Sequence, residues 1–255
     1  MKRLILFFIF IFTISFTWGQ NNLMVVYNTS TFVGSAEGVL IAGKTTAQYE
    51  EGLKSDAKSG EVAENSFSVG GFQHTKIYQD LAQPNAIQMI LYKSNNHLSA
   101  NQKDYFILDE LPEMKWEIDP TEKTTDIQGY ACKEATVNFR GSRFKAYFTT
   151  AIPTPFGPWK FHGLPGLILK VISLDNSRIS WEAEQIIYPS EVQLVDDRKA
   201  FDFDLTLKEY TIQIDKINEE RSRAVAAKSG NTFYPIPDHM KRAQTRERKY
   251  EWETW

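Results

Sequence analysis

The 255-residue sequence has few of the residues from which compact chemical sites are built. Cys132 is the only cysteine, so no disulfide can form within the chain. The four histidines are His74, His97, His162 and His239; they lie far apart, and none belongs to a His-x-x-x-His or Cys-x-x-Cys group. A Gly-x-Ser-x-Gly elbow and a glycine-rich phosphate loop are also missing. We therefore predict no metal site, no cofactor and no familiar catalytic residues, and expect burial of apolar side chains to supply the stability.

The charge balance excludes one further class of partner. The formal net charge is −3 at pH 7, so the chain exerts no overall attraction on nucleic acid or anionic lipid. We expect no nucleic-acid partner.

The N-terminus has the layout of a secretory signal peptide. Lys2 and Arg3 precede an apolar run over 4–16, which is shorter than the ~20 residues that span a bilayer. Thr17-Trp18-Gly19 offers small residues at the −3 and −1 positions of a cleavage site before Gln20. We expect residues 1–19 to be removed, and the exported chain to have neither a lipid anchor nor a transmembrane anchor. Its expected location is the periplasm or the outer membrane.

Two hairpins stand out in the middle of the chain. In 135–149, Gly141 and Ser142 fit the central positions of a type II′ turn, which would pair Phe139 with Phe144. The second hairpin consists of an aliphatic strand over 167–172, a turn over 175–177, and a return strand. In that strand Ile179, Trp181 and Ala183 alternate with polar residues. A strand with one solvent-exposed face of this kind is typical of an antiparallel sheet.

The periodicity changes in the last quarter. Thr206 and Glu209 form a capping box, which predicts a helix over 206–226 that ends before Gly230. Its apolar residues at helical spacing would pack on the sheet: Leu207, Tyr210, Ile214 and Ile217. The predicted fold is α+β and mostly β: a curved antiparallel sheet, a half-barrel being one form of it, with a helix in the C-terminal region.

The remaining segments complete the expected domain organisation. Residues 20–239 form a single β-rich domain, within which 44–60 is a polar insertion, read as an exposed helix or a mobile segment. Residues 240–255 are a basic and aromatic tail, interpreted as a solvated face whose tryptophans dock onto the body.

Between the two hairpins lies a segment that cannot be a helix or a central strand. Four prolines in 152–168 fix φ repeatedly and remove backbone donors, and Pro165-Gly166 fits a type II turn. Two interpretations stay open: a plug that covers the end of a sheet with its aromatics, or a rigid binding surface. The candidate binding or structural residues are Pro153, Phe156, Pro158, Trp159, Phe161, His162, Gly163, Leu164, Pro165, Gly166, Leu167 and Ile168.

The segment Gly163-Leu-Pro-Gly-Leu-Ile168 resembles the motif that names the GLPGLI family of Bacteroidota cell-envelope proteins. Further matching pieces stand in the same order: Trp116–Ile118, Ile127–Cys132, Ala135-Thr136, Phe148-Thr149, Ile152-Pro153 and Gly157–Trp159. Tyr147 stands where a Trp is expected, and Ala151 where an acidic residue is common. The resemblance implies export to the envelope and association with TonB-dependent outer-membrane receptors, but it implies no reaction.

The residues that could carry chemistry are Cys132, His162 and the pair Asp202 and Asp204. Strand parity, absent a bulge, places Cys132 opposite the apolar face and beside the Glu134 carboxylate, so we interpret it as a structural thiol. Of the four histidines, His162 is the best candidate for a metal ligand, because its loop is fixed. Asp202 and Asp204 alternate on one strand face, without the glycine-containing loop of a calcium site.

The leading hypothesis is a non-catalytic envelope protein that binds a partner or ligand, with an outer-membrane receptor or another envelope protein as the partner. Two alternatives remain. One is a lipid or lipoprotein carrier, favoured by an open pocket lined by Phe139, Phe144, Phe148 and Trp181. The other is an envelope hydrolase or peptidase, favoured by His162 beside a carboxylate and a Ser or Cys.

Overall fold

A computed structural model describes residues 22–31, 34–52, 74–92, 103–121, 123–195, 198–200, 202–203, 205–243 and 245–254. Over these residues thirteen strands form one sheet, in the order β13-β6-β5-β4-β3-β2-β1-β12-β11-β10-β9-β7, with β8 paired to β9. The neighbours are antiparallel except β13 and β6. The predicted mostly-β fold with a curved sheet and a helix in the C-terminal region is confirmed.

The longest strands are β1, β2, β9 and β12, while β7, β8 and β13 have only two or three residues each. Their bounds are β1 Asn22–Thr31, β2 Gly34–Ala42, β3 Thr46–Gly52, β4 Thr75–Asp80, β5 Ala86–Leu91, β6 Tyr105–Glu110, β7 Glu117–Ile118, β8 Thr125–Ile127, β9 Tyr130–Phe139, β10 Ser142–Thr149, β11 Leu167–Ser173, β12 Ser180–Ser190 and β13 Leu205–Thr206. The helices are η1 Arg198–Ala200, α1 Leu207–Lys228 and α2 Asp238–Lys241.

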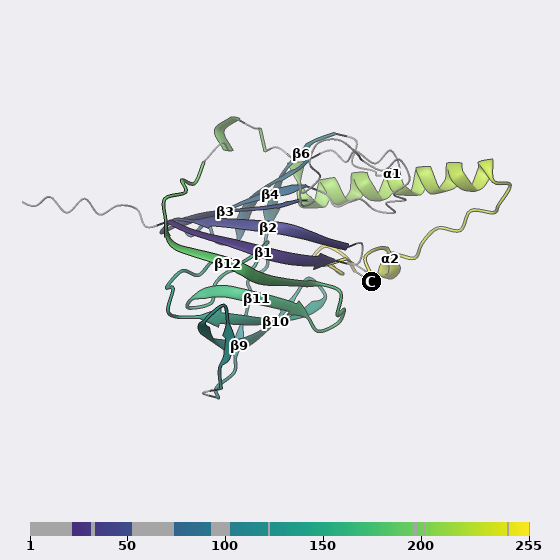
Figure 1. The fold of residues 1–255 in the computed structure, drawn as a ribbon. Coiled ribbons are helices and arrows are strands. Elements are labelled where there is room, and N and C mark those ends of the chain that lie inside the picture. The colour runs from purple at the N-terminus through teal and green to yellow at the C-terminus, as the bar shows by residue number, and fades with distance from the viewer. Residues whose placement is uncertain are drawn as a thin grey trace, which may run out of the picture.

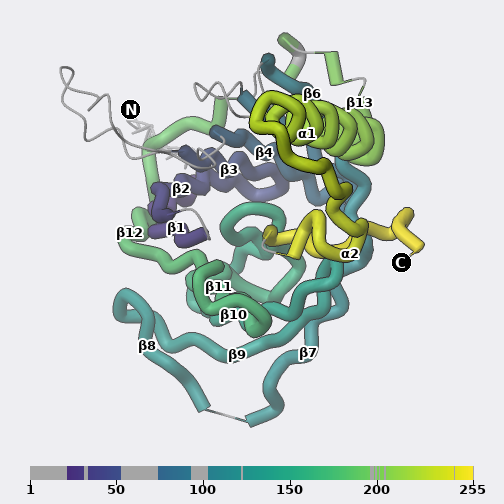
Figure 2. Tube along the Cα trace, turned by 90° about the vertical axis from the view of Figure 1, so that its right-hand side faces the viewer, coloured from purple at the N-terminus to yellow at the C-terminus, as the bar shows by residue number. Residues whose placement is uncertain are grey.

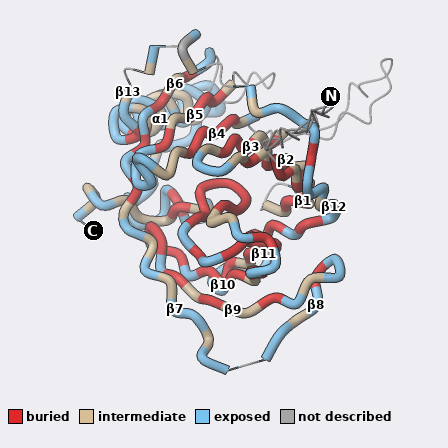
Figure 3. Tube along the Cα trace, turned by 90° about the vertical axis from the view of Figure 1, so that its left-hand side faces the viewer, coloured by how far each residue is buried: buried red, intermediate tan, exposed pale blue. Residues whose placement is uncertain are grey.

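The sheet curls around the loop between β10 and β11 (Figures 2 and 3). Viewed along the strands, this loop lies in the middle of the curve, and most of it is buried (Figure 3). α1 runs beside β6 and β13 at one edge of the sheet (Figure 2), and its second half extends past the strands (Figure 1). The α2 helix and the C-terminal residues return to the mouth of the curved sheet (Figure 2).

The first predicted hairpin forms, but its turn is one residue earlier than expected. The loop is Arg140-Gly141, with φ of 45° and 74°, and Ser142 pairs with Phe139. Positive φ at both central positions is the type I′ geometry. The predicted pairing of Phe139 with Phe144 is therefore wrong; Phe144 pairs with Val137. The buried face is unchanged, because a shift by two residues keeps every side chain on its side of the sheet.

Tertiary contacts explain why a non-glycine residue takes a positive φ at this turn. The carbonyl oxygen of Arg140 accepts hydrogen bonds from the backbone N–H groups of Arg248 and Lys249, at 2.8 and 2.9 Å. Its guanidinium is fully buried among carboxylates. These contacts offset the roughly 1–3 kcal/mol that a residue in a sparsely populated backbone region costs.

The second hairpin matches the prediction. Val171 of β11 pairs with Trp181 of β12, and Lys170 pairs with Glu182. Ile179, Trp181 and Ala183 are buried, while the alternate residues of β12 face outward.

The proline-rich loop folds back on itself, with a bridge between Phe156 and His162. The predicted type II turn at Pro165-Gly166 is wrong, since the left-handed φ of 94° lies at Gly163. Gly166 is needed for a different reason. A Cβ atom there would lie 2.1 Å from the carbonyl oxygen of Thr149. The backbones of the loop and of β10 approach too closely for any side chain.

The interpretation of 44–60 as a polar insertion is wrong over its first part, because Thr46–Gly52 is strand β3 between β2 and β4. Ala47, Tyr49 and Glu51 all face the interior, where they are 1–4% exposed. The polar composition misled the prediction because Glu51 is neutralised by residues far along the chain. Residues 53–60 of the predicted insertion lie outside the described residues, as do Asp204 and Trp255.

The predicted helix is present as α1, which begins at Leu207 and ends at Lys228, two residues beyond the expected end. The Thr206–Glu209 capping box forms, and Gly230 has the left-handed φ of 69° that ends helices. Leu207 is buried, and Tyr210 and Ile214 pack partly against the core; Ile217, expected to do the same, is not among the packed residues.

The loop fills the concave side of the sheet with aromatic rings. Phe161 lies 4.9 Å from Phe144 and 5.3 Å from Trp181, measured between ring centres. Phe139 contacts both Trp159 and Phe161. Phe139, Phe144, Phe148 and Trp181 are at most 1% exposed. The open apolar pocket that would favour a lipid carrier at these four side chains is a filled core instead.

Candidate functional site

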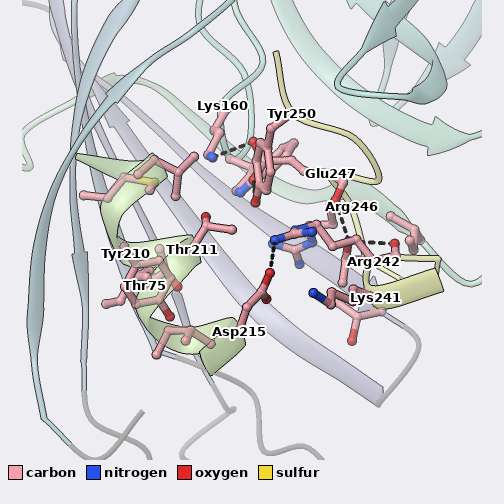
Figure 4. A pocket seen from close by; sticks show the side chains of 18 of the residues that line it. Thr75, Lys160, Tyr210, Thr211, Asp215, Lys241, Arg242, Arg246, Glu247 and Tyr250 are labelled. Carbon is pink, nitrogen blue, oxygen red and sulfur yellow. Dashed lines mark hydrogen bonds and ion pairs between the residues drawn. The ribbon is translucent and has the colours of Figure 1, made fainter. Parts of the chain in front are cut away.

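A cavity of about 760 Å³ lies between the mouth of the sheet, α1 and the C-terminal residues (Figure 4). A volume of this size is typical of small-ligand sites. One wall is apolar and comes from β5, the loop before β12, and α1: Met89, Leu91, Ile179, Leu207, Tyr210 and Ile214. The opposite wall is polar and includes Glu51, Lys160, Arg242, Arg246, Glu247 and Tyr250.

Two residues of the polar wall, Lys160 and Glu247, belong to a network of four buried charges that also includes Asp109 and Arg140. The guanidinium of Arg140 donates to both carboxylate oxygens of Asp109, at 2.7 and 2.9 Å. Lys160 Nζ donates to Asp109 and to Glu247, each at 2.7 Å. Arg140 also donates to Glu247. The two cations and two carboxylates neutralise one another, as buried charges require.

The pKa of Asp109 shows which influence prevails in the network. Burial alone would raise it, but the nearby charge of Lys160 and the hydrogen bonds from Arg140 outweigh burial, and the pKa lies below its ordinary value. Asp109 is therefore ionised at neutral pH. Burial also raises the pKa of the neighbouring Tyr250 phenol, and Glu247 adds to that rise. Neither group is poised to exchange a proton near neutral pH.

A second ionic contact lies on the same wall. Glu51 is 4% exposed and accepts a hydrogen bond from Arg246 at 2.6 Å. Its other oxygen accepts from the Tyr49 hydroxyl at 2.7 Å and from the Trp181 indole at 3.4 Å. The guanidinium carbon of Arg246 lies 4.6 Å from the centre of the Trp181 ring. This is the geometry of a cation–π contact combined with an ion pair.

The C-terminal tail therefore packs against the body, and its interpretation as a solvated face is wrong. The docking of its tryptophans is confirmed for Trp252, which packs partly buried against the core. Arg242 and Glu247 are 7% and 9% exposed. Arg242 binds Asp215 of α1 at 2.7 Å (Figure 4) and Glu253 at 2.6 Å. The sequence placed basic and acidic residues in the tail but gave no sign of their partners, which lie up to 195 residues away.

Most of the predicted site residues are buried, three face outward, and one lines the cavity. Phe156, Pro158, Phe161, His162, Leu164, Gly166, Leu167 and Ile168 are buried among the packed rings, whereas Pro153, Gly163 and Pro165 face outward. Trp159 alone of the predicted set lines the cavity. The plug interpretation thus describes most of the loop. Lys160, which is not among the residues predicted from the sequence, also lines the cavity. A lone lysine among aromatic and proline residues was the available signal.

His162 and Cys132 are both held in structural roles. Burial lowers the pKa of His162, whose Nδ1 lies 3.0 Å from the carbonyl oxygen of Lys160. Among the described residues, its ring makes no hydrogen bond to a carboxylate, serine or cysteine of the kind that would favour a hydrolase. Burial, with a smaller contribution from Asp126, raises the pKa of the Cys132 thiol to about 11. A thiol with that pKa is protonated at neutral pH and is a weak nucleophile.

Cys132 lies inside, at 0% exposure, rather than on the outer face that strand parity predicted. Both Cys132 and Ala135 are buried, three positions apart on β9, so the alternation breaks between them. Its nearby carboxylate is Asp126 of β8 and not the predicted Glu134, which instead binds Lys145.

Two kinds of group are absent from the described part of the chain. No three histidine, cysteine or acidic residues there are grouped as metal ligands. Nor does any helix of those residues have the length and apolar character needed to cross a membrane.

Comparison with known proteins places the fold but not an activity. A family described as "Protein of unknown function (Porph_ging)" matches residues 140–170, which include the Gly163–Ile168 motif. No curated protein matches the chain significantly. Two solved structures of PNGF-II, in space groups P21 and C2, are similar with TM-scores of 0.52 and 0.50. Each is 18% identical to this chain and covers 78% of it. The chain spans about a third of the length of PNGF-II (34% and 33%), and the likeness concerns the fold.

Proposed function

We propose that this protein is an exported, non-catalytic binding protein of the cell envelope that holds a ligand or partner in the cavity beside α1. The observation that carries the proposal is the cavity itself, which joins an apolar wall to a polar one whose named charged groups are paired. Charged groups that are already paired with one another suit recognition better than proton transfer. The location in the periplasm or at the outer membrane rests on the signal-like N-terminus.

The partnership with TonB-dependent uptake is the more specific part of the proposal. It rests on the resemblance of Gly163–Ile168 and its flanking residues to GLPGLI proteins. An accessory of an outer-membrane receptor needs a site for the cargo or for a segment of the receptor. A cavity with one polar and one apolar wall could bind the cargo or a segment of the receptor.

Site-specific photo-crosslinking from α1 tests this function in intact cells. Ile214 lines the cavity, whereas Ile212, two residues earlier on the same helix, is 57% exposed and faces away. A photoreactive residue at position 214 is expected to capture a ligand or an envelope protein, because the side chain points into the proposed site. The adduct is identified by mass spectrometry.

The same probe at position 212 is the matched control, since it samples the surrounding solution from the same helix. Equal capture at both positions, or nothing above background at 214, would contradict a binding role for the cavity.

A further inference from the structure

Glu51 and the two neighbouring tryptophans form a receptacle shaped for a guanidinium group. Tyr49 and Trp181 hold one oxygen of the Glu51 carboxylate, which leaves the other for an incoming donor. The rings of Trp159 and Trp181 stack at 5.5 Å and 15°, and offer a π surface beside that oxygen. All four side chains come from the sheet and the central loop, and they are at most 5% exposed. The receptacle is thus built by the core, without help from the C-terminal segment.

An adjacent receptacle has the opposite sign. Arg140 and Lys160 hold Asp109 and direct further donors at a second carboxylate, which in the structure is that of Glu247. The consecutive residues Arg246 and Glu247 therefore occupy an acidic and a basic receptacle side by side. Recognition of an Arg-acidic pair by two charge-assisted contacts gives orientation as well as affinity.

The segment that fills both receptacles is held as a bound peptide would be. Residues 245–254 contribute no strand to the sheet. Their backbone contacts to the body include the N–H groups of Arg248 and Lys249, which donate to the carbonyl oxygen of Arg140. Arg246, Glu247 and Glu251 supply the ion pairs to the sheet and loop. The segment also lines the cavity, so a peptide in its place would have room for its neighbouring side chains against the apolar wall.

We infer that the two receptacles recognise an extended peptide of a partner protein that carries an arginine followed by an acidic residue, and that Arg246-Glu247 occupies the site in cis. The inference rests on the proposed binding function and names its partner chemistry. A partner peptide gains access by displacing residues 245–250. Its arginine then pairs with Glu51 over Trp181, and its carboxylate with Arg140 and Lys160.

The test uses the full chain with Arg246→Ala and Glu247→Ala, which empties both receptacles. The probe is a fluorescent hexapeptide, Thr-Arg-Glu-Arg-Lys-Tyr, and the control peptide has the first Arg and the Glu exchanged, so composition and charge are equal. Fluorescence anisotropy is expected to show at least about tenfold tighter binding of the probe than of the control peptide. The parent protein should bind the probe at least about tenfold more weakly than the variant, because its own segment competes. Adding Glu51→Gln to the variant should remove the preference.

Equal binding of the two peptides, or equal affinity of parent and variant, would overturn the inference. Should the double substitution unfold the chain, Arg246→Ala alone keeps Glu247 in the ion network. That variant is then expected to bind N-acetyl-arginine amide at least about tenfold more tightly than N-acetyl-lysine amide, and equal binding would again overturn the inference.

The two proposals can fail separately. Capture of a non-protein ligand at position 214, together with no peptide preference, would leave the binding function standing and refute the peptide. A preference for the probe peptide without any capture in cells would support the peptide specificity and refute the binding function in the envelope.

Discussion

Replacing Arg140 with alanine is expected to lower the free energy of unfolding by about 3–5 kcal/mol, the cost of breaking a buried ion pair. Asp109 would lose the guanidinium that binds both its oxygens, and both side chains are fully buried. Water cannot replace those hydrogen bonds without opening the core. Urea unfolding, followed by tryptophan fluorescence, measures the loss.

Arg143 is the matched control for this substitution. It lies three residues away in the same hairpin and pairs with Asp175, but its side chain is 62% exposed. Arg143→Ala should change the stability by less than about 1 kcal/mol, as is usual for surface ion pairs. Similar losses for the two variants would mean that the Arg140 network is hydrated rather than buried.

The substitution Gly166→Ala is expected to cost at least about 3 kcal/mol, at the upper end of the overpacking range. The added Cβ would lie 2.1 Å from the carbonyl oxygen of Thr149 and 2.7 Å from its carbonyl carbon. Both are backbone atoms of a buried strand end, so neither can move aside without displacing the central loop. Thermal and urea unfolding of the variant would measure the loss.

Gly43→Ala provides the comparison, because a Cβ at position 43 meets no atom closer than 3.7 Å. It should be close to neutral. A Gly166→Ala variant that unfolds at the same urea concentration as the parent would show that the loop and β10 do not approach as described.

The sequence predicted those parts of the fold that depend on local periodicity. Both hairpins and the buried faces of their strands followed from alternation, and α1 followed from helical spacing and its cap. The exact position of a turn was harder to predict from the sequence. The choice between the Arg140-Gly141 and Gly141-Ser142 turns depends on Arg248 and Lys249, which lie more than 100 residues away.

Most of the candidate site could not be predicted from the sequence either, because it also depends on contacts between distant residues. β3 looked like a polar insertion because the partner that neutralises Glu51 is Arg246, at the other end of the chain. The tail looked solvated because its three glutamates, read alone, neutralise much of its basic charge. The long-range pairs of Glu247 with Lys160 and of Arg246 with Glu51 show that these charges belong inside. Long-range ion pairs leave no periodic trace in a single sequence.

The most direct test of the account is a double-mutant cycle between Glu51→Gln and Arg246→Ala, measured by urea unfolding of the four proteins. If the C-terminal segment completes the site by placing Arg246 on Glu51, the two substitutions should be coupled by at least about 1 kcal/mol, as contacting residues are. Additivity within about 0.3–0.5 kcal/mol would show that the two side chains do not meet in solution. In that case neither the polar wall of the cavity nor the receptacle beneath it would exist as described.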